Sequence, residues 1–138
     1  LALDLDVIHK WGASMLVNLI EEFEYRMVHI DHIESAIAGR MTLVKLPIRD
    51  MDVPDAGWER LWQEKGPIVR AALRDGDRIC VHCLGGLGRT GLFAARLLIE
   101  FGMSPDDAIL TIRHARPGTI QTVAQEKYVR GCVPGVGL

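Results

Sequence analysis

The sequence lacks the features that a membrane-spanning or nucleic-acid-binding protein needs. Its apolar runs, such as residues 96–101, are short and flanked by charge, so none can span a bilayer, and no signal-peptide pattern opens the chain. The net charge of −2 at pH 7 offers no basic field for a nucleic-acid backbone. We therefore expect neither a membrane nor a nucleic acid as a partner.

Cysteine is also scarce. The three cysteines, Cys80, Cys83 and Cys132, form an odd and sparse set, which argues against a disulfide framework and predicts a reducing, cytoplasmic location. The spacing of Cys80 and Cys83 is compatible with half of a zinc site, but Cys132 and the scattered histidines offer no second pair of ligands. We expect no metal.

Length and composition fit one domain. The 138 residues are 49% hydrophobic and 25% charged, which suffices for one compact core and leaves no room for a second. We expect a single domain over residues 1–138 that acts as a monomer. The chain opens at Leu1 instead of methionine, so we also expect a trimmed chain or a fragment of a longer protein.

Helical and strand patterns alternate along the chain. Apolar runs of strand length predict strands over residues 14–20, 42–46 and 78–82. Helical periodicity and capping residues predict helices over residues 4–11, 58–74, 91–101, 105–116 and 122–130. Gly66-Pro67 should kink or split the second of these helices, and the alternation in residues 78–82 predicts a buried central strand. The order predicts an α/β fold with a mainly parallel central sheet flanked by helices.

The most informative segment is HCLGGLGRTG, residues 82–91, between a predicted strand and a predicted helix. A glycine-rich turn lets successive backbone N–H groups point at one centre, and the positive end of the helix dipole adds to them. Arg89 has the reach to close this ring with a bidentate guanidinium on two phosphate oxygens. We expect phosphate to be bound by Leu84, Gly85, Gly86, Leu87, Gly88 and Arg89.

Such a loop favours the anionic form of a cysteine, because a helix N-terminus and a nearby cation both stabilise a thiolate. We therefore expect Cys83 to be a nucleophile at neutral pH. His82 more plausibly orients the loop through hydrogen bonds than acts as a base, since a thiolate needs no proton removed. A nucleotide-binding loop of the Walker type is excluded, because no Gly-Lys-Ser/Thr follows the glycines.

The segment H-C-x5-R-T-G resembles the active-site signature of the protein tyrosine phosphatase superfamily. It is most similar to the dual-specificity members, the kinase-associated phosphatase branch especially. Residues 46–50, LPIRD, are similar to the loop that carries the family's general acid. Residues 116–125, RPGTIQTVAQ, are similar to the glutamine loop of the tyrosine-specific members. The resemblance covers residues 12–130, implies the cysteine phosphatase fold, and suggests that a strand which usually precedes Asp4 is missing.

The resemblance also implies roles for individual residues. Cys83 would be the nucleophile, Arg89 the phosphate clamp, and Thr90 the hydroxyl that assists the departing thiolate. Gln121 and Gln125 would position the attacking water. Asp50 would be the general acid, although two neighbours compete for that role.

Those neighbours are Asp52 and Asp55, of which Asp55 more plausibly caps the helix near Trp58. The sequence does not decide whether Arg113 and Arg116 are surface charges or lie at the rim of a site. The implied substrate is phosphotyrosine in a protein, with phosphoserine and phosphothreonine as further candidates, and no cofactor is required.

Two other classes of protein share parts of this pattern. A silent phosphopeptide-binding module would keep Arg89 and the glycines but usually lose the cysteine or the acid. A rhodanese-like sulfur transferase presents a cysteine at a strand-to-helix turn, but its loop lacks the paired Arg89-Thr90.

Overall fold

The structure is a computed structural model that describes residues 2–85 and 87–137. The chain forms two compact units, which we treat separately. The sheet unit comprises the residues up to Pro47 together with Asp55–His82, and the helix unit comprises Ile48–Pro54 and the residues from Cys83 onward. In the described part of the chain, no helix is long and apolar enough to cross a membrane.

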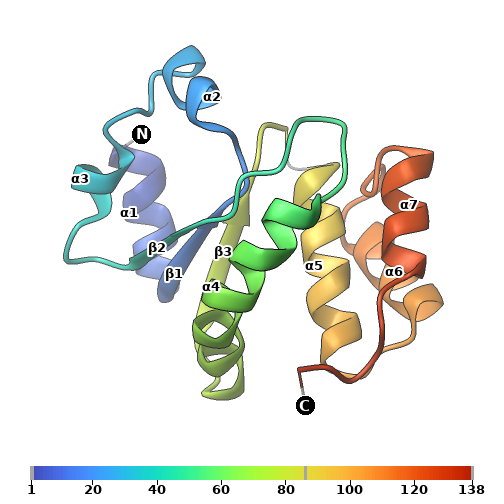
Figure 1. Ribbon diagram of the computed structural model, residues 1–138. Helices are drawn as coiled ribbons and strands as arrows, with labels where there is room; N and C mark the ends of the chain where they lie inside the picture. Colours follow the sequence, from blue (N-terminus) through green and yellow to red (C-terminus); the bar gives the residue numbers. More distant parts are fainter. Residues whose placement is uncertain (1, 86, 138) are drawn as a thin grey trace. The chain divides into compact units, whose positions relative to one another are not determined.

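The sheet unit contains a parallel sheet (Figure 1). Its strands are β1 (Ala13–Asn18), β2 (Thr42–Lys45) and β3 (Arg78–His82), in the order β2-β1-β3, and both strand pairs are parallel. Asn18, the last residue of β1, pairs with Lys45 and with His82. The three strands therefore end level with one another, at the carboxyl end of the sheet. The predicted α/β class is confirmed.

The prediction that residues 78–82 form the central strand is wrong for the described strands. β1 is central because it pairs on both sides, whereas β3 pairs with β1 only, and its residues after Arg78 are half-buried. Alternation of apolar residues reports that a strand has an apolar face, but it does not fix the strand's place in the order.

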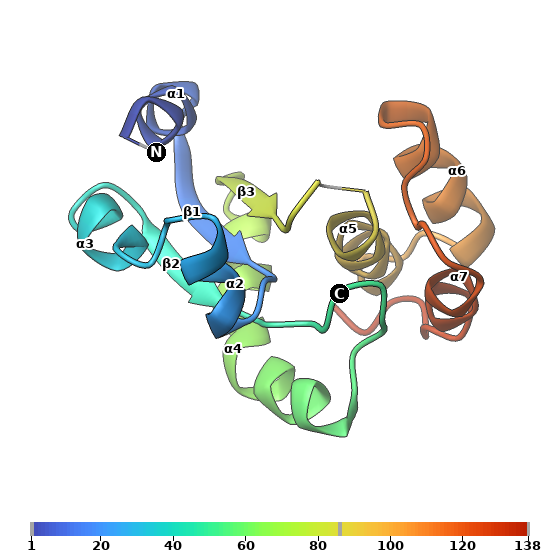
Figure 2. The same ribbon diagram turned by 90° about the horizontal axis from the view of Figure 1, so that it is seen from above.

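Helices cover both faces of this sheet. The helices of the sheet unit are α1 (Ala2–Trp11), α2 (Glu22–Met27), α3 (Ile33–Ile37) and α4 (Ala56–Arg74). α1 packs against β1, α3 against β2 and α4 against β3, and Figure 2 shows α1 and α4 on opposite sides of the strands. α2 and α3 were not predicted, because helices of one or two turns have little periodicity and depend on tertiary packing.

Of the two outcomes predicted for Gly66-Pro67, a kink or a split, the split does not occur. α4 runs through Pro67, although a proline inside a helix removes one backbone hydrogen bond. Trp58 and Trp62 are buried on its apolar face and stack with ring centroids 5.7 Å apart. This packing outweighs the local preference, and Asp55 caps the helix as predicted, accepting a 2.8 Å hydrogen bond from Trp58 N.

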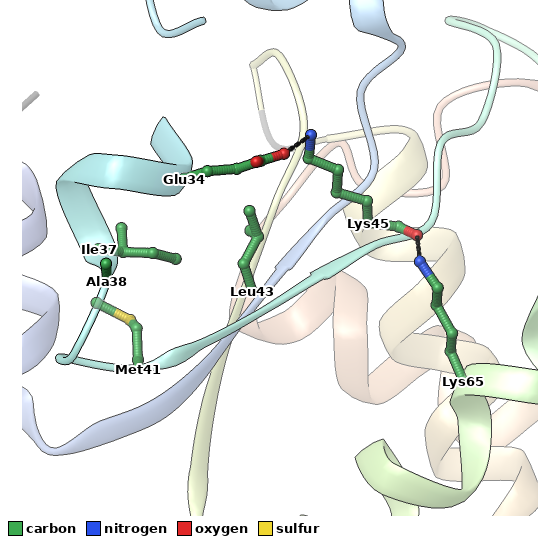
Figure 3. Close-up of a pocket in the computed structure, with 7 residues that line it drawn as sticks. All are labelled: Glu34, Ile37, Ala38, Met41, Leu43, Lys45 and Lys65. Carbon is green, nitrogen blue, oxygen red and sulfur yellow. Dashed lines mark hydrogen bonds and ion pairs between the residues drawn. The ribbon is translucent and has the colours of Figure 1, made fainter. Parts of the chain in front are cut away.

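A pocket of about 300 Å³ lies beside β2 within the sheet unit (Figure 3). Lys45 pairs with Glu34, and Lys65 Nζ donates a 3.2 Å hydrogen bond to Lys45 O, so both ammonium groups at the pocket have partners. None of the residues predicted to act on phosphate lines it. The lining residues are Glu34, Ile37, Ala38, Met41, Leu43, Lys45 and Lys65.

The helix unit consists of α5 (Arg89–Glu100), α6 (Pro105–Ala115) and α7 (Val123–Arg130), which pack against one another in all three pairings. Ser104 Oγ caps α6 by accepting from Asp107 N, and Thr122 Oγ1 caps α7 by accepting from Gln125 N. α5 begins two residues before the predicted start at 91. Arg89 and Thr90 therefore belong to its first turn.

Candidate active site

Cys83 is held by the residues that follow it. It is the first residue after β3, and we call residues 83–88 the cysteine loop. Thr90 Oγ1, in the first turn of α5, donates a 3.0 Å hydrogen bond to Cys83 Sγ. The Cys83 thiol in turn donates to Leu84 O at 3.5 Å. The sulfur is therefore close to the N-terminus of a twelve-residue helix, where unpaired N–H groups and the helix dipole favour an anion.

Glycine is required at two places in the cysteine loop. Gly85 has φ 79°, in the left-handed region that favours glycine. At Gly88 a methyl group would lie 3.0 Å from Gln125 Nε2 and 3.2 Å from Gln121 Oε1, so the close approach of both glutamines depends on the missing side chain. Gly86 lies outside the described residues.

Arg89 joins the cysteine loop to a second loop, Ile48–Pro54, which we call the acid loop. Arg89 is buried, with 1% of its surface exposed. Its Nη1 donates a 2.9 Å hydrogen bond to Ile48 O, and its Nη2 lies 3.4 Å from Asp50 Oδ1. The Asp50 side chain is 61% exposed, so its carboxylate is both near the guanidinium and accessible.

The competing acids are engaged differently. Asp52 Oδ1 accepts a 2.8 Å hydrogen bond from Val53 N, and Asp52 N donates to Arg49 O, so this residue shapes the turn of the acid loop. Asp55 belongs to the sheet unit and caps α4. Of the three aspartates, the structure pairs Asp50 with Arg89.

The two predicted glutamines lie in different environments. We call residues 116–122 the glutamine loop, and Gln121 is part of it. Gln125 is fully buried in α7, and its Oε1 accepts from Gln121 N at 3.0 Å and from Thr122 N at 3.1 Å. Its Nε2 donates a 3.1 Å hydrogen bond to Asp52 O in the acid loop. Gln125 thus contacts all three loops.

Two arginines that the sequence left undecided support the same loops. Arg113 donates to Thr119 O and Ile120 O, each at 3.1 Å, and pairs with Glu126 at 2.8 Å. Arg116 Nη2 donates a 3.1 Å hydrogen bond to Gly85 O in the cysteine loop. Three of these four contacts go to backbone carbonyls, which no sequence pattern identifies.

The remaining predicted residues lie nearby in the chain. Leu87 O accepts a 3.0 Å hydrogen bond from Ile120 N, which ties the cysteine loop to the glutamine loop. His82 ends β3 and accepts from Leu19 N through its carbonyl; its role in orienting the cysteine loop stays a prediction.

Burial raises the pKa of the Cys80 thiol, so Cys80 is a poor nucleophile at neutral pH. The described residues contain no cluster of three or more metal-ligating side chains.

Comparison with known proteins gave one family model and several relatives. The family model, described as "Polymorphic toxin system, DSP-PTPase phosphatase", matches residues 3–103. Cyclin-dependent kinase inhibitor 3 of Rattus norvegicus is 38% identical over 88 residues, which cover 60% of the chain. The chain spans only 39% of that relative's length. Protein tyrosine phosphatase type IVA 3 of Homo sapiens is 33% identical over 129 residues, covering 90% of the chain and 69% of the relative.

Solved structures give the same result for the fold. A kinase-associated phosphatase with its catalytic cysteine replaced by serine superposes with a TM-score of 0.83 at 25% identity, covering 93% of the chain and 72% of that structure. Tk-PTP in its active form superposes with a TM-score of 0.72 at 25% identity, covering 94% and 86% respectively.

Proposed function

The chain belongs to the dual-specificity phosphatases of the protein tyrosine phosphatase superfamily, and from that membership we propose that it hydrolyses phosphate monoesters through a phosphocysteine intermediate on Cys83. The family and the cysteine phosphatase fold expected from the sequence are thereby confirmed. The observation that carries the mechanistic proposal is the buried Arg89, which contacts Ile48 O and Asp50 from the first turn after the cysteine loop.

In the first step the Cys83 thiolate attacks phosphorus and the bond between phosphorus and the leaving oxygen breaks. Asp50, in its protonated form, donates its proton to that oxygen, so an alcohol or phenol departs. Arg89 offers two N–H groups to the equatorial oxygens, together with the N–H groups of the cysteine loop. The Arg89 guanidinium is held by Ile48 O before reaction, so it stabilises the developing charge without reorganisation.

In the second step water attacks the phosphocysteine and the sulfur–phosphorus bond breaks. Asp50, now a carboxylate, takes the proton from the water, and inorganic phosphate is released. Gln121, whose Oε1 lies near Gly88, orients the water. Thr90 Oγ1 donates to the departing thiolate along the hydrogen bond of 3.0 Å, so the thiolate leaves with part of its charge already stabilised.

The substrate class we propose is phosphotyrosine in proteins, with phosphoserine and phosphothreonine as further substrates. Leu84 and Leu87 are neutral, whereas lysines at such positions would favour a phosphoinositide. The named relatives include tyrosine phosphatases. We further propose that residues 1–138 act as one monomeric domain in a reducing compartment, since Cys80, Cys83 and Cys132 are all free thiols.

The test is hydrolysis of an aryl phosphate in the presence of a chelator. We expect an unchanged rate with chelator, inhibition by vanadate as a mimic of pentacoordinate phosphorus, and no activity in Cys83→Ser. Loss of activity in chelator would overturn the metal-free mechanism. Sulfur transfer from thiosulfate without phosphatase activity would indicate the rhodanese-like alternative.

A further inference from the structure

The side-chain amide of Gln125 donates a hydrogen bond to a backbone carbonyl of the acid loop, Asp52 O. The side chain is fully buried, and its Oε1 accepts hydrogen bonds from Gln121 N and Thr122 N. Its Nε2 donates to Asp52 O at 3.1 Å. The amide therefore has partners on both its oxygen and its nitrogen, and all of them are backbone atoms.

The acceptor of this hydrogen bond, Asp52 O, is two residues from Asp50 in the acid loop. Between the two aspartates lies Met51, with φ 63°, in the left-handed region where a residue with a branched or long side chain is strained. A strained turn persists only when its surroundings hold it. Here the turn is held by Asp52 N donating to Arg49 O at 3.0 Å and by the contact of Asp52 O with Gln125.

The acid loop is thus fixed at both ends of the segment that carries Asp50. Arg89 holds it on one side through Ile48 O at 2.9 Å, and Gln125 holds it on the other through Asp52 O. Gln125 also lies against Gly88 of the cysteine loop. One buried amide therefore spans the acid loop, the cysteine loop and the glutamine loop.

We propose that Gln125 is a positioning residue that fixes Asp50 for proton transfer, and that it does not orient the attacking water, a role left to Gln121. This inference rests on the proposed function of the site. A displaced acid loop would misplace the Asp50 carboxyl, and a displacement of about 1 Å is enough to cost a large part of the rate. Positioning of Asp50 and orientation of the attacking water predict different kinetic patterns for a Gln125 variant.

The variant Gln125→Glu separates these patterns. It keeps an acceptor for Gln121 N and Thr122 N but replaces the donor to Asp52 O by a carboxylate oxygen, which repels that carbonyl. A positioning role predicts that formation of the phosphocysteine from phenyl phosphate slows by about 10-fold or more, while its formation from a nitrophenyl ester, whose leaving group needs little protonation, slows by less than about 2-fold. A water-orienting role predicts equal slowing of both esters and a burst of phenol as phosphoenzyme accumulates.

Two comparisons make the result specific. Gln63→Ala, at an exposed glutamine of α4, should leave both esters unchanged. Gln121→Ala should give the burst that Gln125→Glu lacks. The melting temperature of each variant separates a local effect from general unfolding.

A structure of the wild-type chain with vanadate bound tests the same proposal without relying on any variant. We expect Gln125 Nε2 to stay within hydrogen-bond distance of Asp52 O. A Gln125 amide turned to the axial vanadate oxygen, or a leaving-group-independent burst in Gln125→Glu, would overturn the positioning role. Absence of aryl phosphatase activity in the wild type would instead remove the proposed function, while the Gln125 contact in the crystal would still decide the geometry.

Discussion

Thr90 Oγ1 lies 3.0 Å from Cys83 Sγ and donates a hydrogen bond to it. Residues 84–89 separate the two in sequence, and the start of α5 at Arg89 brings them together. A hydroxyl in this position stabilises negative charge on sulfur. It therefore assists the step in which the thiolate is the leaving group.

Thr90→Ala should slow hydrolysis of the phosphocysteine more than its formation, because only the second step expels the thiolate. Rapid-quench kinetics with an aryl phosphate should show a burst of product and a slower steady state. Thr90→Ser, which keeps the hydroxyl, should behave like the wild type. Equal slowing of both steps in Thr90→Ala would remove Thr90 from this role.

Asp50→Asn should slow formation of the phosphocysteine from a phenyl or alkyl phosphate by about 10²–10⁴-fold and spare this first step for a substrate whose leaving group is already a stable anion. The reason is that a general acid matters only when the leaving oxygen needs a proton. Asp52→Asn is the matched control, since Asp52 Oδ1 serves Val53 N in the turn. A leaving-group dependence in Asp52→Asn but not in Asp50→Asn would reverse the assignment.

Arg89→Lys should weaken phosphopeptide binding by about 10–100-fold, because a lysine keeps the charge but loses the bidentate fork and the contact with Ile48 O. Cys83→Ser should bind the same peptide with near-normal affinity and fail to turn it over. Titration calorimetry with a phosphotyrosine peptide compares the two variants. Near-normal affinity of Arg89→Lys would show that the fork does not hold the phosphate.

Gly91→Ala should destabilise the protein by about 1–3 kcal/mol, since a methyl group there would lie 2.9 Å from Thr119 Cβ and 3.0 Å from Ile120 N. Gly131→Ala provides the control, because its methyl group would be 3.5 Å from the nearest atom, Tyr128 O, and φ is −86°. Denaturant unfolding should separate the two variants. Equal stabilities would show that α5 and the glutamine loop adjust without cost.

The sequence predicts the parts of the site that are close in the chain. Cys83, Arg89 and Thr90 occur within one strand-to-helix turn, so their proximity follows from the covalent spacing once the helix start is recognised. Asp50 comes from another segment, and only the family resemblance suggested its place. Its pairing with Arg89 at 3.4 Å is a tertiary contact that no local pattern specifies.

The sequence does not predict which backbone carbonyl a side chain contacts. Gln125 and Asp52 are 73 positions apart, and Arg116 and Gly85 are 31 apart. Each acceptor is a carbonyl that every residue possesses, so the residue type carries no signal. The continuous α4 across Pro67 is a similar case, since the packing that sustains the helix lies outside the local pattern.

The central claim is that Cys83 carries the phosphoryl group during turnover. The most direct measurement is rapid acid quench of Thr90→Ala during hydrolysis of an aryl phosphate, followed by peptide mass spectrometry. The account predicts a phosphorylated peptide with the phosphate on Cys83, formed in the presence of chelator. A phosphoenzyme on another residue would contradict it. So would a product burst in Thr90→Ala with no phosphoenzyme detected.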